Sequence, residues 1–459
     1  MTRDAAIAQA QTRFDDGTFE ADLAALIAIP TDSTQPDAAP SLLRYLEYWE
    51  PRLTEMGFSC TRLAVEGCDL PFLFAERIED AGLPTILTYG HGDTVPAMQG
   101  AWAKGRDPHV LSKEDGVWYG RGIADSKGQH LININALSSV LKVKGALGFN
   151  VKLLLEMGEE AGSPGLHDLA RREGARLKAD LFLASDGPRL EASAPTIFLG
   201  ARGGASFKLS IIRRKGGRHS GNFGGAIANP GVELSNAIAC IIDARGHLKI
   251  KGWKPEALPQ AARRALTGIT PVAGDVDEWW GEPDLTPAER VHAWVAAEIL
   301  AFTCGTPERP VNAIPPEAHA WLQLRFVKGV DMAQIAPALR THLDAHGFEH
   351  VQITPEGPSF AASQTPTDHP FAQFVSASIA KTCGEAPVVL PSLGGSLPND
   401  VFTDILNLPA IWVPHSYPGC NQHAPDEHLP AALMREALGL MAGVFYDLGE
   451  SRPDQIGAA

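Results

Sequence analysis

The chain has 459 residues, a formal net charge of −15, and 44% hydrophobic residues. This length favours two or more domains with substantial cores, and the composition is that of an ordinary soluble globular protein. The acidic balance weighs against nucleic-acid and anionic-membrane surfaces, so we expect neither as a partner. The six cysteines form no Cys-x-x-Cys pair, and the chain has no apolar leader and no apolar run of about 20 residues. These features predict a cytoplasmic protein.

The first 200 residues are predicted to form an α/β domain. Apolar side chains at helical spacing predict a helix over 4–30 that Pro30 ends. Strands and helices then alternate over 72–183, which is typical of a mostly parallel sheet with helices on both faces. A further helix is predicted over 126–143, directly after Asp125.

The pattern changes near residue 203. Alternation with period 2 at 206–211 and 319–326 predicts half-buried strands of an antiparallel sheet. Helical stretches follow at 232–243 and 332–345. The order strand–helix–strand–strand–helix–strand fits an inserted α+β, ferredoxin-like domain over 203–357.

The last hundred residues return to the first domain. A helix is expected over 371–382, a strand that resumes the first sheet over 407–413, and a closing amphipathic helix over 429–448. The first domain is therefore expected to be discontinuous, with segments 1–202 and 358–459.

Five short segments place acid–base or metal-binding side chains after apolar runs, and four of these runs read as strands. Ligands bind at the carboxyl ends of strands in open α/β sheets, so these side chains could converge on one crevice. The donors are imidazoles and carboxylates without a thiolate, a set that suits Zn²⁺, Mn²⁺ or Co²⁺. The pattern predicts a metal-assisted hydrolase. The segments are Tyr89–Asp93, Gly122–Gly128, Met157–Glu160, Ser185–Gly187 and Asn421–Ala424.

Each of these residues alone has an ordinary reading beside the functional one. His91 is a plausible ligand whose tautomer Asp93 would fix, or else a surface histidine. Asp125 lies in a Gly-rich turn and could bridge two cations or cap a helix. Glu159 and Glu160 would point in different directions on an extended backbone. One could then bind metal while the other contacts the attacking water, or both could form a solvated acidic turn.

The motifs together resemble those of the M20 family of dinuclear metallopeptidases. In chain order they are Gly-His-Gly-Asp-Thr-Val-Pro, Gly-Arg-Gly-x-Ala-Asp-x-Lys-Gly, Gly-Glu-Glu-x-Gly-Ser-x-Gly, Ser-Asp-Gly and a late His. The resemblance runs from about residue 20 to residue 448. It implies two divalent cations per subunit, Zn²⁺ first and Mn²⁺ or Co²⁺ as alternatives. It also implies Glu159 as general base and Asp93 as a further catalytic-site residue. The implied metal ligands are His91 and Asp186 for one cation, Glu160 and His423 for the other, and Asp125 for both.

The resemblance extends to the inserted domain. The segment Arg218–Gly225 resembles the family's lid motif, whose histidine, here His219, reaches the active site of a partner subunit. Asn312 and Arg325 match lid positions that hold the substrate, and Arg325 would offer a forked donor for a carboxylate. The loop Gly394–Pro398, with Gly395 and Ser396, resembles the substrate-carboxylate loop of carnosinase-like dipeptidases. The resemblance thus implies a homodimer through a lid domain at 203–357.

Three functions remain open from the sequence. The first is a dipeptidase-like hydrolase of short peptides, because Asp186 resembles the aminopeptidase and dipeptidase branches, where other branches usually carry Glu. The second is an amidohydrolase of N-acyl amino acids or other small amides, because Gly187-Pro188 replaces longer polar residues of carnosinase-like enzymes. The third is a non-catalytic binding protein, which the intact set of ligand and base positions disfavours. The 251–310 insertion matches no template.

Overall fold

The computed structural model describes residues 2–271 and 276–457, which form two compact units. The flanking unit comprises residues 1–200, 365–391 and 398–459, and the inserted unit comprises 201–364 and 392–397. The inserted unit thus extends beyond the expected 203–357 and includes a loop that the sequence had placed in the other domain. Each unit has its own hydrophobic core and is described by itself.

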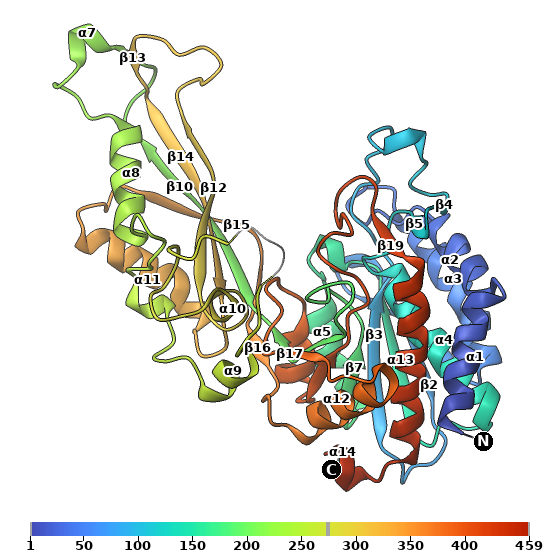
Figure 1. Ribbon diagram of the computed structural model, residues 1–459. Coiled ribbons are helices and arrows are strands. Elements are labelled where there is room, and N and C mark those ends of the chain that lie inside the picture. The colour runs from blue at the N-terminus through green and yellow to red at the C-terminus, as the bar shows by residue number, and fades with distance from the viewer. Residues whose placement is uncertain (1, 272–275, 458–459) are drawn as a thin grey trace. The chain divides into compact units, whose positions relative to one another are not determined.

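A mixed eight-stranded sheet lies at the centre of the flanking unit (Figure 1), in the order β1-β2-β6-β3-β7-β18-β8-β17. The pairs β6–β3, β3–β7, β7–β18 and β8–β17 are parallel, and the other three are antiparallel. This confirms the predicted mainly parallel sheet. The strands are β1 (Ser59–Val65), β2 (Cys68–Arg77), β3 (Thr85–His91), β6 (Asn150–Glu156), β7 (Leu181–Ala184), β8 (Thr196–Phe198), β17 (Val388–Leu390) and β18 (Ala410–Trp412).

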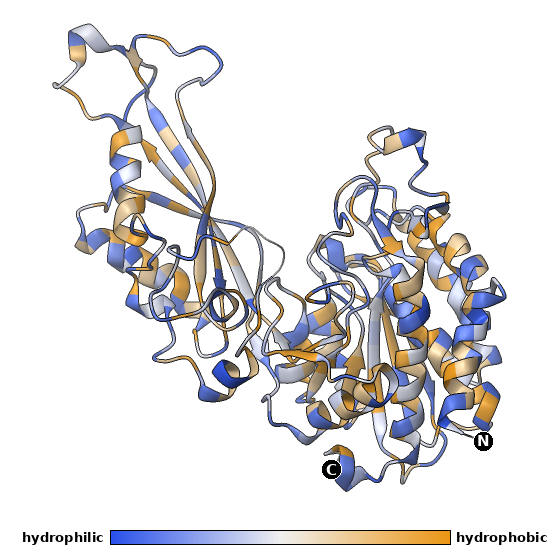
Figure 2. Ribbon diagram, viewed as in Figure 1, coloured by the Kyte–Doolittle hydropathy of each residue, from blue (hydrophilic) through white to orange (hydrophobic). Residues whose placement is uncertain are grey.

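Helices cover both faces of this sheet. On one face α1, α4 and α13 pack together over a core of aliphatic side chains. On the other face lie α5 and the short helix η4, where Phe402 stacks on Phe182 at 4.0 Å between ring centroids. Figure 2 shows hydrophobic and hydrophilic residues on both α1 and α13, as expected for helices with one face on a core. The helices are α1 (Arg3–Asp15), α2 (Thr18–Ile27), α3 (Ala39–Glu55), α4 (Lys127–Lys144), α5 (Leu166–Arg172), α6 (Gly174–Leu177), η4 (Val401–Ile405), α12 (Pro370–Cys383), α13 (Ala431–Glu450) and α14 (Pro453–Ile456).

The single helix expected over 4–30 is wrong, because the chain forms two helices there. Gly17 separates α1 from α2 and adopts a φ of 83°, a left-handed conformation that glycine tolerates and a helix interior does not. The unit is completed by a three-stranded sheet of β4 (Ser112–Glu114), β5 (Val117–Tyr119) and β19 (His428–Pro430), and by the turns η1 (Ala103–Gly105) and η2 (Glu159–Ala161). Two short strands, β9 (Gly200–Ala201) and β16 (Ser363–Gln364), lie where the chain passes from one unit to the other.

The inserted unit is a ferredoxin-like α+β domain, as predicted. Its antiparallel sheet has the order β12-β14-β10-β15, and α8 and α11 pack against each other and share its core. Along β14, alternate side chains from Ala318 to Phe326 are buried while those between them are partly exposed, which confirms one covered face. The principal elements are β10 (Gly203–Ile212), α8 (Pro230–Ile241), β12 (Ala296–Cys304), β14 (Glu317–Phe326), α11 (Met332–Ala345) and β15 (Gln352–Phe360).

The described residues of the 251–310 insertion form three short helices and the edge strand β12. Trp294 is buried in the core of this unit, whereas Trp279 is 61% exposed. Core packing therefore accounts for only part of the tryptophans in this stretch. The remaining short elements are β11 (Arg218–His219), α7 (Ser220–Phe223), η3 (Lys251–Trp253), α9 (Gln260–Ala265), α10 (Pro287–His292) and β13 (Ala313–Ile314). Within the described parts of the chain, no helix has both the length and the apolar character of a membrane span.

Candidate metal centre

The polar segments singled out in the sequence meet at one edge of the eight-stranded sheet. His91 ends β3, Glu159 and Glu160 follow β6, and Asp186 follows β7. These three strands are parallel neighbours, so their carboxyl ends meet. Asp125 approaches from the loop before α4. All of these residues belong to the flanking unit.

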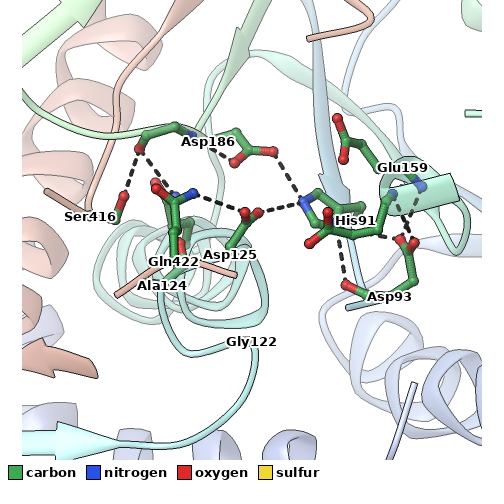
Figure 3. Close-up of polar contacts among 12 residues, drawn as sticks. His91, Asp93, Gly122, Ala124, Asp125, Glu159, Asp186, Ser416 and Gln422 are labelled. Carbon is green, nitrogen blue, oxygen red and sulfur yellow. Dashed lines mark hydrogen bonds and ion pairs between the residues drawn. The ribbon is translucent and has the colours of Figure 1, made fainter. Parts of the chain in front are cut away.

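A first cluster joins His91, Asp125 and Asp186. His91 Nε2 lies 3.0 Å from Asp125 Oδ1 and 3.4 Å from Asp186 Oδ2 (Figure 3). The three residues are buried. One nitrogen and two carboxylate oxygens therefore face one another out of contact with bulk water.

A second cluster joins Asp125, Glu160 and His423. His423 Nε2 lies 2.9 Å from Asp125 Oδ2 and 3.2 Å from Glu160 Oε2. The side chain of His423 is 55% exposed, so this cluster opens to solvent while the first does not. The two oxygens of Asp125 thus face two different clusters. In each cluster the donor atoms lie within 4.8 Å of one another, close enough for all three to bind a single ion.

Asp93 organises both His91 and the pair of glutamates. Its Oδ1 accepts a hydrogen bond from Glu159 N at 3.1 Å and lies 3.3 Å from His91 Nδ1. Its Oδ2 accepts from Glu160 N at 3.0 Å and from the hydroxyl of Ser33 at 2.7 Å. The carboxylate can therefore hold the proton of His91 on Nδ1 and leave Nε2 free to bind a cation.

An extended backbone at the two glutamates is one possibility from the sequence, but the structure shows none there. They form the 3₁₀ turn η2, and the two hydrogen bonds from their backbone N–H groups to Asp93 hold this turn. Glu160 reaches the second cluster, and Glu159 takes no part in either cluster. The expected separation of the two side chains is kept, although the backbone that produces it is a tight turn.

Glu427 is a structural residue of the site that sequence reasoning missed. It is 1% exposed, and its Oε1 accepts hydrogen bonds from the backbone N–H groups of Ala124 at 2.8 Å and Asp125 at 3.1 Å. Its Oε2 accepts from Gly122 N at 2.9 Å and from Arg121 Nη1 at 2.8 Å. This buried carboxylate fixes the loop that presents Asp125. Its position between Asp426 and His428 reads as a solvated polar turn, and no local signal distinguishes it.

The electrostatics of the two clusters fit bound cations. Burial opposes a charge on His91, but Asp186, Asp125 and Asp93 together raise its pKa well above the usual range. Burial, followed by the charge of Asp125, raises the pKa of Glu160 to about 7. Hydrogen bonds to Asp125 and Glu160 raise the pKa of His423 to about 10. The carboxylates repel one another, and either protonation or a bound cation would relieve this repulsion.

Asp186 is a further buried carboxylate that a bound cation would stabilise. Burial raises its pKa, and its buried Oδ2 lies 3.4 Å from His91 Nε2 without a well-formed hydrogen bond to any described residue. A buried carboxylate oxygen that lacks a good hydrogen bond is costly unless an ion binds it. The imidazole and carboxylate donors fit Zn²⁺, Mn²⁺ or Co²⁺, and the residues present therefore suit a pair of divalent cations.

The site residues expected in the inserted unit form two groups at opposite ends of β14. His219 and Asn312 lie at one end, where His219 pairs with Ala313 and Ser220 N donates to Asn312 O at 2.9 Å. Figure 1 shows α7 and β13 together at this end of the sheet. Arg325 lies at the other end, where its Nη1 donates to the hydroxyl of Ser396 at 2.6 Å. At about 3.3 Å per strand residue, the two ends of β14 (Glu317–Phe326) are roughly 30 Å apart.

A buried arginine holds the Gly394–Ser396 loop in place. Arg202 Nε donates to Gly394 O at 2.9 Å, and the hydroxyl of Ser396 donates to Arg202 O at 2.8 Å. Ser396 therefore bridges Arg202 and Arg325. Gly395, the middle residue of this loop, is partly exposed.

Comparisons with known proteins show the family and the fold of this chain. The sequence model of the family described as Peptidase family M20/M25/M40 matches residues 87–447. The Cysteinylglycine-S-conjugate dipeptidase of Corynebacterium striatum is 28% identical over 392 residues, which cover 82% of this chain and 83% of that protein. The human Beta-Ala-His dipeptidase is 32% identical over 247 residues, which cover 51% of this chain and 48% of that protein, so this match spans about half of each. The crystal structure of human carnosine dipeptidase 1 has the same fold, with a TM-score of 0.78, 22% identity, and coverage of 98% of this chain and 99% of that one.

Proposed function

Because the chain belongs to peptidase family M20/M25/M40, we propose that it is a dinuclear metallohydrolase that cleaves the peptide bond of dipeptides or similarly short peptides. The family resemblance inferred from the sequence motifs is thereby confirmed, and with it the class of enzyme. The observation that carries the proposal is the position of Asp125, whose two carboxylate oxygens face separate clusters of metal-ligand type.

The proposed ligands follow from the two clusters. One divalent cation would be held by His91 and Asp186, the other by Glu160 and His423, and Asp125 would contribute to both. Imidazole and carboxylate donors favour Zn²⁺, with Mn²⁺ and Co²⁺ as alternatives. When bound, two such cations supply Lewis-acid stabilisation of the negative charge that develops on the scissile carbonyl.

Glu159 is the proposed general base. It lies beside both clusters without belonging to either, and Asp93 fixes its backbone. Glu159 would take a proton from the attacking water and pass it to the leaving amine, the usual work of a positioned carboxylate. Burial, partly offset by the charge of His91, raises the pKa of Glu159 well above the usual range. Cations held in the two clusters would oppose this rise and leave the carboxylate able to accept a proton.

The inserted unit supplies the proposed substrate contacts. Arg325 presents a planar, always charged guanidinium suited to the free carboxylate of a short peptide. Ser396 and Gly395 would complete this subsite, because Arg202 holds their loop against Arg325. A requirement for a free carboxylate distinguishes an enzyme that cleaves next to the C-terminus from one that cleaves within long chains.

We propose that the active sites are shared between two subunits. His219 and Asn312 are exposed and lie beyond the start of β14, roughly 25 Å or more from Arg325 near its end. This is too far for one chain to apply both groups to one small substrate. A partner subunit with two-fold symmetry would bring its own His219 to a site that holds the first subunit's Arg325. There His219 would stabilise the oxyanion of the substrate.

A mixing experiment tests the shared site. A His219→Ala chain and a Glu159→Gln chain should each be inactive, yet a mixed dimer should have one site with both defects and one with neither. Partial activity on mixing supports the proposal. Mixed dimers that form, as judged by differently tagged chains, but show no more activity than the parents would mean that His219 does not act across an interface.

The second candidate is an amidohydrolase of N-acyl amino acids. Gly187 and Pro188 follow Asp186, and Gly187 O already accepts from the hydroxyl of Ser416 at 3.0 Å. This segment offers no charged side chain to a free substrate amine.

All six cysteines are free thiols, in keeping with a cytoplasmic location for either activity.

A matched substrate panel decides between the two activities. The metal-loaded enzyme should hydrolyse a free dipeptide and lose most activity when the C-terminal carboxylate is amidated. If the N-acetylated amino acid is hydrolysed and the free dipeptide is not, the amidohydrolase is correct. Hydrolysis of neither class would count against the proposed function itself.

A further inference from the structure

A different donor cluster lies in the inserted unit, on the helical layer of its ferredoxin-like domain. Cys240 lies near the end of α8, His342 lies in the last turns of α11, and His346 follows α11 directly. The two helices pack against each other. The Sγ of Cys240 and one nitrogen of each imidazole lie within 4.8 Å of one another. The three residues are called the thiol cluster below.

Its geometry follows from helix spacing. His342 and His346 are four residues apart, so they lie on one face of the helix, and their ring centroids are 4.3 Å apart. Cys240 approaches from the neighbouring helix. Two imidazoles from one helix turn and a thiol from a facing helix are a common way of assembling a transition-metal site.

The hydrogen bonds fix the tautomer of both rings. His342 Nε2 donates to the backbone carbonyl of Cys240 at 2.7 Å, and His346 Nδ1 donates to the carbonyl of His342 at 2.7 Å. A carbonyl can only accept, so these nitrogens carry the protons and the other nitrogen of each neutral ring keeps a lone pair. Metal-binding histidines usually donate their second ring N–H to such a carbonyl or carboxylate.

We propose that Cys240, His342 and His346 bind one transition-metal cation of the Zn²⁺ type, separate from the cations of the dinuclear centre. A thiolate with two imidazoles suits Zn²⁺ or Co²⁺ and leaves a fourth position for water. His346 is exposed and provides a path of entry. Binding would tie the end of α8 to the end of α11.

Binding also requires a proton to leave. The S–H bond of Cys240 breaks as the sulfur–metal bond forms, and the proton passes to solvent. Burial raises the pKa of the Cys240 thiol, so without metal it stays protonated at neutral pH. Metal uptake at this cluster should therefore release about one proton per ion.

Cobalt separates this cluster from the dinuclear centre. A thiolate bound to Co²⁺ gives a sulfur-to-metal charge-transfer band in the near ultraviolet, and the clusters around Asp125 contain no sulfur ligand. Titration of the metal-free full chain with Co²⁺ should produce this band, and the band should be complete at about three equivalents of cobalt per chain, of which two fill the dinuclear centre and one fills the thiol cluster. Absence of the band at saturating Co²⁺ would overturn the proposal.

Variants assign the band to its residues. Cys240→Ser should abolish it, whereas Cys304→Ser removes another half-buried thiol of the inserted unit and should leave it intact. His346→Ala changes an exposed residue, so the fold should survive. This variant should lower the cobalt affinity of the thiol cluster, measured from the charge-transfer band. The loss should exceed the roughly 10- to 100-fold that removing an outer contact to a metal ligand costs. A band that persists in Cys240→Ser, or that is unaffected by His346→Ala, would refute the assignment.

Discussion

Replacing Glu427 by glutamine should destabilise the flanking unit although it changes a single atom. The carboxylate accepts four hydrogen bonds, two on each oxygen, and pairs with the buried Arg121. A glutamine side chain keeps one acceptor oxygen. Whichever way the amide is turned, its NH₂ group faces two N–H donors, and Arg121 loses its negatively charged partner.

The magnitude follows from these losses. Leaving a buried donor unsatisfied costs about 1–3 kcal/mol, and breaking a buried ion pair costs about 3–5 kcal/mol. The two effects share Arg121 and do not add fully, so we expect Glu427→Gln to lower the free energy of unfolding by about 3–5 kcal/mol. Because the same carboxylate fixes the backbone at Asp125, metal affinity should fall as well.

Urea unfolding of the chelated protein, followed by circular dichroism, measures the first effect without a contribution from bound metal. Glu50→Gln is the matched control, because Glu50 accepts two hydrogen bonds from Arg62 on the protein surface. A surface pair of this kind contributes about 0–1 kcal/mol. Equal stability of the two variants would refute the role assigned to Glu427.

Three further predictions concern the site itself. Asp93→Asn should lower metal affinity by roughly 10- to 100-fold, because Asp93 orients His91 and holds the backbone of both glutamates; unchanged affinity in a metal titration would contradict this. Arg325→Lys should raise KM for a free dipeptide more than it lowers kcat, since the forked guanidinium is lost while a positive charge remains, and an unchanged KM would exclude the proposed carboxylate contact. Exhaustive chelation should abolish hydrolysis and added Zn²⁺, Mn²⁺ or Co²⁺ should restore it, whereas activity in metal-free protein would rule out the metal mechanism.

Residues at strand ends could be predicted because local sequence determines where they lie. His91 is the last residue of a buried strand and Asp186 follows another, and parallel neighbours bring such ends together. The alternation along β14 likewise predicted a half-covered sheet. These predictions rest on the spacing of apolar side chains, which can be recognised within a stretch of about ten consecutive residues.

Residues that act through distant backbone could not be predicted in this way. Glu427 binds the loop at Asp125 from about 300 residues away, and its partners are backbone N–H groups that leave no trace in the side-chain pattern. The turn at Glu159 depends on Asp93, which is 66 residues away. The break at Gly17 was missed because the apolar spacing on either side reads as continuous.

The most direct test of the account measures bound metal and kcat on the same sample of Glu159→Gln. The Cys240→Ser background removes any contribution of the thiol cluster to the metal count. We expect two metal ions per chain, as in the parent, with kcat for a free dipeptide reduced by about 100-fold or more, the scale of a lost acid–base group. Loss of metal together with activity would mean that Glu159 is a ligand, and unchanged kcat would mean that it is not the base.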